Sequence, residues 1–265
     1  MAPKHSKSFR PRICVLRAPG TNCDAETVSA LEYCGAEAVV RHVNTFKRPG
    51  QLEEFNGLVF PGGFSFGDHV RSGIIFARKF AAHIGRDLED FVEAGKPVLG
   101  ICNGMQVLVE AGLIPGNMPA AMYTNDSAKF ECRWIRLMVE PKGKSLFTKG
   151  LKGTILMPIA HGEGKFSLEP GREQELADQL ADNGQIIFRY ANEKGKPAEG
   201  VYPINPNGAI ADIAGVANPK GNVMALMPHP ERASFEWQYP DWTRAQQKEC
   251  APLKVFENMV CACTK

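Results

Sequence analysis

Three short segments of the sequence carry residues that could perform acyl transfer. The first is Gly100-Ile101-Cys102-Asn103-Gly104, where an apolar run (PVLG) gives way to a helical pattern (NGMQVLVEAG). A reactive residue between two glycines is typical of the nucleophile elbow, a sharp strand-to-helix turn in which larger neighbours would collide. A cysteine at a helix N-terminus also meets unpaired N–H groups that favour the thiolate. We therefore expect Cys102 to be a nucleophile rather than a buried structural cysteine.

The second segment, MPHPER at 227–232, follows an apolar run and supplies a base with an orienting group. Its two prolines stiffen the loop. A carboxylate at Glu231 that accepts from one imidazole nitrogen of His229 would leave the other nitrogen to share a proton with a thiol. Taken by itself, a histidine beside prolines is more typical of a surface loop.

The third segment, PGGFSFGD at 61–68, contains glycines that let backbone approach a ligand closely. A developing oxyanion needs N–H donors already in place, and we expect these donors to be the amides of Gly63 and Asn103. A tight turn that needs positive φ would explain the same glycines. The three segments together favour a Cys102–His229–Glu231 triad.

Alternating strands and helices must position these segments. Apolar runs at 13–16, 38–43, 57–63 and 97–101 alternate with helical patterns, the longest at 72–94. Continuous apolar strands predict a parallel sheet buried between helices, with ligands at its carboxyl edge. The pattern of residues in the second half of the sequence predicts mixed or antiparallel strands and a final helix from about Trp242 through Val260. We expect a single domain at 13–265 after a disordered tail at 1–12.

Composition excludes several classes of function. The net charge is +2 over 265 residues, with no basic stripe, so nucleic acid is not an expected partner. No apolar stretch is long enough to span a membrane, and the start lacks the apolar region of a secretory signal. Eight cysteines without paired CxxC spacing favour a reducing cytoplasm and no metal site, because Cys261 and Cys263 have no second pair.

The ordered motifs PGG, GxCxGxQ and HPE resemble those of the class I, or triad, glutamine amidotransferases. Longer stretches are similar to the glutaminase subunits of phosphoribosylformylglycinamidine synthases in particular. These stretches, found between about Ile13 and Val260, are APGTNCD, FPGGFSFGDHVRSG, GICNGMQVL, PIAHGEGKF and NPNGAIADIAGVANPKGNVMALMPHPERA.

The resemblance implies a flavodoxin-like three-layer α/β/α sandwich with a mostly parallel central sheet. It also implies that glutamine is hydrolysed to glutamate and ammonia by the Cys102–His229–Glu231 triad. Gly62, Gly63, Gln106 and the loop at His161 would shape the glutamine pocket. As alternatives, Gln106 could simply be solvated on its helix, and His161 could only cap a strand.

The resemblance further implies partners. The ammonia would pass to a large ATP-dependent synthetase subunit that makes phosphoribosylformylglycinamidine from phosphoribosylformylglycinamide in de novo purine biosynthesis, with a small bridging subunit. This chain shows no phosphate-binding glycine loop, so no cofactor is expected in it, and ATP and magnesium are expected on the synthetase.

Three other functions are alternatives to glutamine hydrolysis for this synthetase. They are a cysteine hydrolase of similar fold, a redox sensor in which Cys102 is merely oxidised, and a glutaminase that serves another synthetase. Asn22 and Asp24 are expected to cap a helix. No role for Cys23 follows from the sequence.

Overall fold

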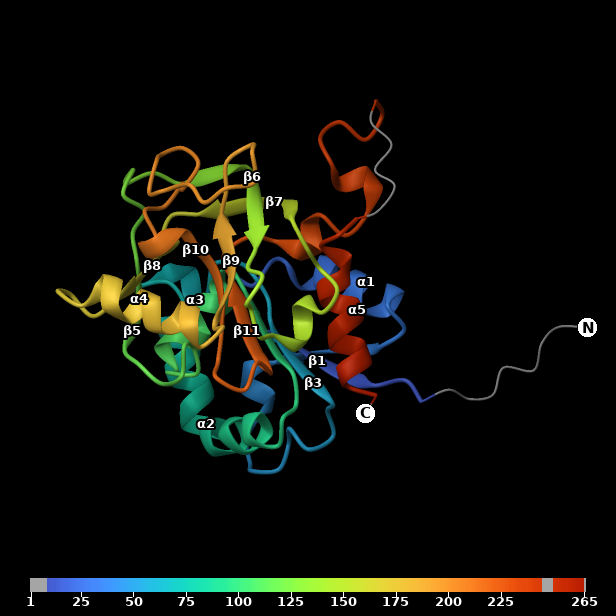
Figure 1. The fold of residues 1–265 in the computed structure, drawn as a ribbon. Helices are drawn as coiled ribbons and strands as arrows, with labels where there is room; N and C mark the ends of the chain where they lie inside the picture. Colours follow the sequence, from blue (N-terminus) through green and yellow to red (C-terminus); the bar gives the residue numbers. More distant parts are fainter. Residues whose placement is uncertain (1–8, 245–249, 265) are drawn as a thin grey trace, which may run out of the picture.

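A nine-stranded sheet forms the centre of the computed structural model, which describes residues 9–244 and 250–264 (Figure 1). Across the sheet the strands follow the order β2 (Glu37–His42), β1 (Arg12–Arg17), β3 (Gly57–Phe60), β4 (Val98–Ile101), β11 (Val223–Leu226), β10 (Ile213–Ala217), β9 (Ile186–Tyr190), β6 (Glu131–Val139) and β7 (Thr154–His161).

The sheet has a parallel half and an antiparallel half. Strands β2, β1, β3, β4 and β11 run parallel, whereas β10, β9, β6 and β7 pair antiparallel in succession. Every residue of β3, β4, β10 and β11 is buried, as expected for central strands covered on both faces. Because Ile101 pairs with Leu226 at the ends of β4 and β11, the loops that follow these two strands emerge side by side.

Helices cover both faces of the sheet. On one face α1 (Asp24–Tyr33) contacts α5 (Leu253–Ala262), and on the other α2 (Ile74–Glu93) contacts α3 (Asn103–Glu110) (Figure 1). A small two-stranded antiparallel sheet of β5 (Ala120–Tyr123) and β8 (Lys165–Leu168), together with α4 (Glu173–Asp182), lies beside the antiparallel half. The predicted α/β sandwich is thus confirmed, although β5, β8 and α4 were not foreseen.

Two predicted boundaries were wrong. The last helix begins at Leu253 rather than near Trp242, because Pro252 has no N–H to donate and can only stand at a helix start. The expected tail falls mainly on residues 1–8, which lie outside the described residues. Within 9–12 the expectation fails, since Arg10 donates to the carbonyl of Ala36 and β1 already begins at Arg12.

The start of α1 also differs from the prediction. Cys23, not Asn22 or Asp24, is the N-cap residue, and its side chain makes no capping hydrogen bond. Asp24 instead forms an ion pair with Arg17, and the amide oxygen of Asn22 accepts from the thiol of Cys23 at 3.1 Å. The side chain of Cys23 therefore points away from the helix end.

Two further expectations can be compared with the described part of the chain. None of its helices is both long and apolar enough to cross a membrane. Near the C-terminus, Cys263 is buried and donates to the carbonyl of Asn56, whereas Cys261 is exposed. Because the two thiols face different surroundings, they do not form a metal-binding pair.

Candidate active site

Cys102 stands on a strained turn between β4 and α3. Its φ of 51° and ψ of −106° lie outside the regions that non-glycine residues favour. A side chain at Gly104 would come within 1.9 Å of the carbonyl oxygen of Phe60, and one at Gly100 within 2.6 Å of Leu108. The two flanking glycines therefore let the helix approach the sheet closely, as the elbow pattern predicts.

The thiol of Cys102 is buried and points toward the end of β7. Its Sγ atom donates weakly to the carbonyl oxygen of Ala160 at 3.6 Å. The backbone N–H of Cys102 donates to Leu226 at 2.8 Å, which fixes the turn against β11. This main-chain bond holds the nucleophile beside the end of β11.

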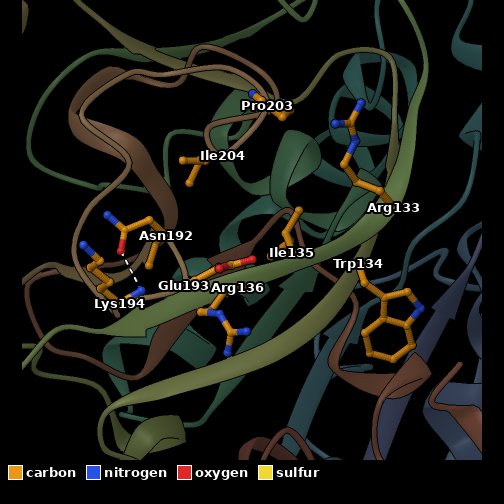
Figure 2. Close-up of a pocket in the computed structure, with 10 residues that line it drawn as sticks. Arg133, Trp134, Ile135, Arg136, Asn192, Glu193, Lys194, Pro203 and Ile204 are labelled. Carbon is orange, nitrogen blue, oxygen red and sulfur yellow. Dashed lines mark hydrogen bonds between the residues drawn. The ribbon is translucent and has the colours of Figure 1, made fainter. Parts of the chain in front are cut away.

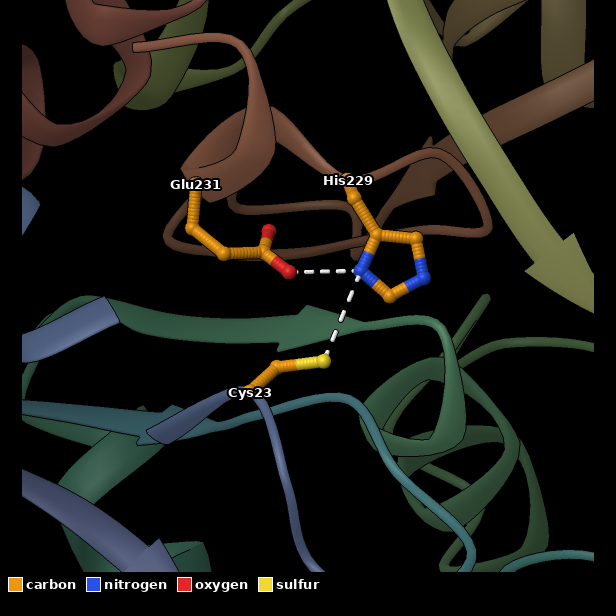
Figure 3. A group of neighbouring side chains, drawn as sticks. All are labelled: Cys23, His229 and Glu231. Atoms are coloured by element: carbon orange, nitrogen blue, oxygen red, sulfur yellow. Dashed lines mark hydrogen bonds and ion pairs between the residues drawn. The ribbon is translucent and has the colours of Figure 1, made fainter. Parts of the chain in front are cut away.

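His229 and Glu231 form a buried pair beside this thiol. The Nδ1 atom of His229 lies 2.5 Å from Oε1 of Glu231, and both side chains are almost fully buried (Figure 3). Burial alone would lower the pKa of His229, but the negative charge of Glu231, assisted by the nearby Cys102, raises it well above its ordinary value. The Nε2 atom of His229 has no hydrogen-bond partner in the described chain, so it is free to serve the thiol or a substrate.

Gly62 makes room for the imidazole. A Cβ atom at this position would lie 2.7 Å from Cε1 of His229 and 3.1 Å from Sγ of Cys23. These distances are too short for ordinary contact, so any side chain here would displace the histidine ring.

We therefore predict that Gly62→Ala lowers kcat/KM for glutamine hydrolysis by about a hundredfold, the usual cost of moving a catalytic group by about 1 Å. Gly85→Ala is the matched control, because a Cβ at Gly85 would meet only Ala81 at 3.6 Å on an exposed turn of α2. Steady-state glutaminase rates of both variants test this, and a wild-type rate for Gly62→Ala would contradict the steric argument.

The two backbone amides expected to hold an oxyanion are free to donate. Neither the N–H of Gly63 nor that of Asn103 donates to another group in residues 9–244 or 250–264. The oxyanion loop, residues 62–68, is held to the segment before α1 by the bond from Phe64 N–H to Gly20 at 2.9 Å. The geometry thus suits the predicted oxyanion donors.

Gln106 connects the elbow helix to the loop after β7. Its Nε2 atom donates to the carbonyl of Glu163 at 2.6 Å, and its Oε1 atom accepts from the side chain of Asn103 at 2.9 Å. Since both ends of the amide are used within the protein, Gln106 does not present a free polar group.

The hydrogen bonds of Asn125 define the tautomer of His161. The Nδ2 atom of Asn125 donates to the carbonyls of Lys129 and His161, so its Oδ1 atom must be an acceptor. Because this oxygen lies 3.1 Å from Nδ1 of His161, that nitrogen carries the proton. Burial, with a smaller effect of the charge on His229, lowers the pKa of His161 to about 4. His161 is therefore neutral, and its Nε2 atom presents a buried lone pair without a partner.

Unsatisfied polar atoms gather in this region of the molecule. In the described chain, five buried side-chain atoms lack a hydrogen-bond partner, and they belong to Ser65, Asp68, His161, His229 and Glu231. Such atoms are rare in folded proteins and indicate where a ligand completes the bonding. Sequence reasoning missed Ser65 and Asp68 as individual residues, although the segment PGGFSFGD had been singled out.

Two large open cavities lie elsewhere on the molecule. One, of about 640 Å³, is lined by β6 and the loop 191–204, with Arg133, Trp134 and Lys194 at its walls (Figure 2). Another, of about 720 Å³, lies between the two-stranded β5–β8 sheet and α4. Neither lining includes a cysteine or a histidine, so neither cavity holds the cysteine and histidine expected for this site.

Comparison with known families shows the class of protein to which this arrangement of cysteine, histidine and glutamate belongs. Residues 10–261 match the family described as "CobB/CobQ-like glutamine amidotransferase domain". The nucleophile elbow and buried histidine–glutamate pair thus belong to a glutamine amidotransferase domain, as the motifs had indicated.

Individual relatives narrow the class further. Phosphoribosylformylglycinamidine synthase subunit PurQ of Archaeoglobus fulgidus is 43% identical over 244 residues, which cover 86% of this chain and 89% of the relative. The PurQ subunit of Dehalococcoides mccartyi is 40% identical over 252 residues, covering 93% and 95%. A chain in the structure of PurLQS from Thermotoga maritima is 32% identical, with a TM-score of 0.73 over 96% of this chain and 99% of that one. The chain belongs to the PurQ family of phosphoribosylformylglycinamidine synthase subunits.

Proposed function

We propose that this chain is the glutaminase subunit of a phosphoribosylformylglycinamidine synthase in the cytoplasm. It hydrolyses glutamine and supplies the ammonia for converting phosphoribosylformylglycinamide to the amidine in purine biosynthesis. The observation that carries the proposal is the grouping of Cys102 with the buried His229–Glu231 pair and the free amides of Gly63 and Asn103. A single domain spanning 13–265 carries this site.

The first half of the reaction forms a thioester. The Cys102 thiolate attacks the carboxamide carbon of glutamine, and the amides of Gly63 and Asn103 donate to the oxyanion. Collapse of the tetrahedral intermediate breaks the C–N bond, and the protonated His229 gives its proton to the departing ammonia. Glu231 holds the imidazole by Nδ1 throughout, so that Nε2 faces the reaction.

The second half releases glutamate. Neutral His229 takes a proton from water, the hydroxide attacks the thioester carbonyl, and the same amides hold the new oxyanion. Collapse of this second tetrahedral intermediate breaks the C–S bond, which frees glutamate and returns the Cys102 thiolate beside protonated His229. The lone pair on Nε2 of His161 accepts an N–H of glutamine, while Gln106 and Gly62 shape the pocket around it. No cofactor of this chain takes part, and ATP with magnesium acts on the synthetase.

The exposed mouth of the site offers a surface to the large synthetase subunit. Phe64 of the oxyanion loop and Phe130, which precedes β6, are 42% and 52% exposed, with ring centroids 6.0 Å apart. Exposed aromatic pairs of this kind are enriched at protein interfaces. The name PurLQS of the matched assembly is in keeping with a large partner and a small bridging one.

The oxyanion loop is strained, like the turn at Cys102. Phe66 and Asp68 within the loop, and Val70 just after it, have positive φ, although none is glycine. Each such residue costs about 1–3 kcal/mol, which the surrounding contacts must offset. We propose that the loop is poorly aligned in the isolated chain and that docking of the synthetase aligns its amides.

We therefore expect slow glutamate release by the purified chain and a rise of about a hundred- to a thousandfold when the synthetase and its nucleotide are added, the cost of one misplaced oxyanion donor. Phe130→Ala should weaken this activation, whereas Tyr33→Ala removes an exposed aromatic ring on α1 and should not. Full activity without the partner would overturn the gating proposal and leave the triad standing. If no glutamate forms under any condition, the proposed function is wrong.

A further inference from the structure

Cys23 contacts the catalytic pair on the side remote from Cys102. Its sulfur lies 3.9 Å from Nδ1 of His229, the nitrogen that also faces Glu231 (Figure 3). Only 1% of Cys23 is exposed, and its N–H donates to the carbonyl of Gly62 at 3.2 Å, which fixes it beside the oxyanion loop. Burial raises the pKa of this thiol, so Cys23 is a neutral group rather than a second nucleophile.

Arg232 completes the surroundings of this sulfur. Its Nη2 atom donates to Sγ of Cys23 at 3.1 Å, and its Nε atom lies 4.0 Å from Oε1 of Glu231. That carboxylate oxygen is the one that accepts from His229. The side chain of Arg232 is 34% exposed and could turn toward solvent. Its hydrogen bond to the sulfur, the one that this side chain donates within residues 9–244 and 250–264, favours the position near the carboxylate.

We propose that Cys23 and Arg232 are positioning residues of the triad. The sulfur of Cys23 seats the guanidinium against Glu231, and the positive charge held there limits how strongly Glu231 retains the proton on His229. A histidine that must first donate its proton to ammonia and then accept one from water cannot hold that proton too tightly. The pair thereby sets the upper pH limit of glutamine hydrolysis.

A metal ion is a less suitable occupant of the same cluster. Cys23, His229 and Glu231 offer ligand atoms within 4.8 Å of one another. However, a cation already donates to the sulfur at 3.1 Å, and a metal would have to displace it and break the contact between His229 and Glu231. The charge that a metal would supply is present on Arg232.

Several other groups act on His229. Glu231, Cys102 and the contact with Cys23 all raise its pKa, and the buried His161 faces it from β7. Arg232 is the permanent positive charge among these neighbours. Because a nearby cation disfavours the imidazolium, removing Arg232 should raise the pKa of His229 and move the basic limb of the rate profile to higher pH.

The test is the pH dependence of kcat/KM for glutamine hydrolysis by the full chain assembled with its synthetase. Arg232→Gln should shift the basic limb upward by about one pH unit. Cys23→Ala should shift it upward by less, because this change releases the guanidinium but also removes the contact by which Cys23 raises the pKa of His229. The double variant should shift the limb no further than Arg232→Gln alone, because the loss of the guanidinium already includes the loss of its position. Cys23→Ser keeps a hydrogen-bond acceptor for Arg232, and Arg232→Lys keeps the positive charge. Both variants should therefore show the same basic limb of the rate profile as the wild type.

Arg17→Gln is the matched charge control, since Arg17 pairs with Asp24 at the start of α1 without contacting Cys23. Its limb should coincide with that of the wild type. The inference is overturned if the limbs of Arg232→Gln and Cys23→Ala also coincide with it, or if their shifts add. If Cys23→Ala does not fold, the comparison of the basic limbs of Arg232→Gln and Arg17→Gln still tests the inference. The inference rests on the proposed triad, whose own failure would show as an inactive wild-type enzyme.

Discussion

Cys102→Ser is expected to abolish glutamine-dependent synthesis by the assembled enzyme while leaving synthesis from added ammonia intact. A serine hydroxyl has a far higher pKa than a thiol, so it cannot form the acyl intermediate through a histidine arranged for sulfur. We expect glutamine hydrolysis to fall by about a thousandfold or more. The measurement is product formation with glutamine and, separately, with ammonium chloride as the nitrogen source.

Cys132→Ser provides the matched control, because it makes the same chemical change at an exposed cysteine on β6. This variant should use both nitrogen sources like the wild type. Substantial use of glutamine by Cys102→Ser would disprove the assignment of the nucleophile, whereas loss of the ammonia-dependent reaction would indicate a damaged interface instead.

His229→Ala is expected to lower the rate of glutamine hydrolysis by about a hundred- to ten-thousandfold, because it removes the proton donor and acceptor. Glu231→Gln should cost less, since the amide oxygen can still accept from Nδ1 although its negative charge is lost. Glutamine affinity should remain nearly unchanged in both variants, because neither side chain is proposed to bind the substrate before reaction. Separate kcat and KM values test these expectations.

Glu236→Gln is the control for the second variant, since it neutralises an exposed carboxylate five residues further along the same segment. It should behave like the wild type. If both His229→Ala and Glu231→Gln kept wild-type rates, the triad would be wrong. If Glu231→Gln were the more damaging of the two, Glu231 would do more than orient the imidazole.

The residues of the proposed triad could be singled out in the sequence because each lies within a few positions of a strong local signal. Glycines flank Cys102 at a strand-to-helix junction, and prolines flank His229 directly after an apolar strand. The parallel half of the sheet was predictable for a similar reason, since its central strands are continuously apolar. The pairing of β4 with β11 brings Cys102 and His229 together. No local sequence pattern indicates this pairing, and only the family resemblance implied that the two residues are close.

The features that sequence reasoning missed depend on tertiary contacts. The role proposed for Cys23 depends on its contacts with Arg232 and His229, which are far from it in the sequence. The neutral tautomer of His161 follows from the orientation of Asn125, and no pattern of residue types could have shown it. The predicted start of α5 was too early. Pro252, which is the N-cap residue, marks where this helix begins.

The place of β11 between β4 and β10 has a consequence for the newly made chain. A ribosome delivers Cys102 on the order of ten seconds before His229, at usual rates of synthesis. Until the later strand inserts beside β4, the thiol has no base and no partner carboxylate. A truncated or half-folded chain therefore cannot consume glutamine, and the appearance of glutaminase activity marks the moment at which the central sheet closes.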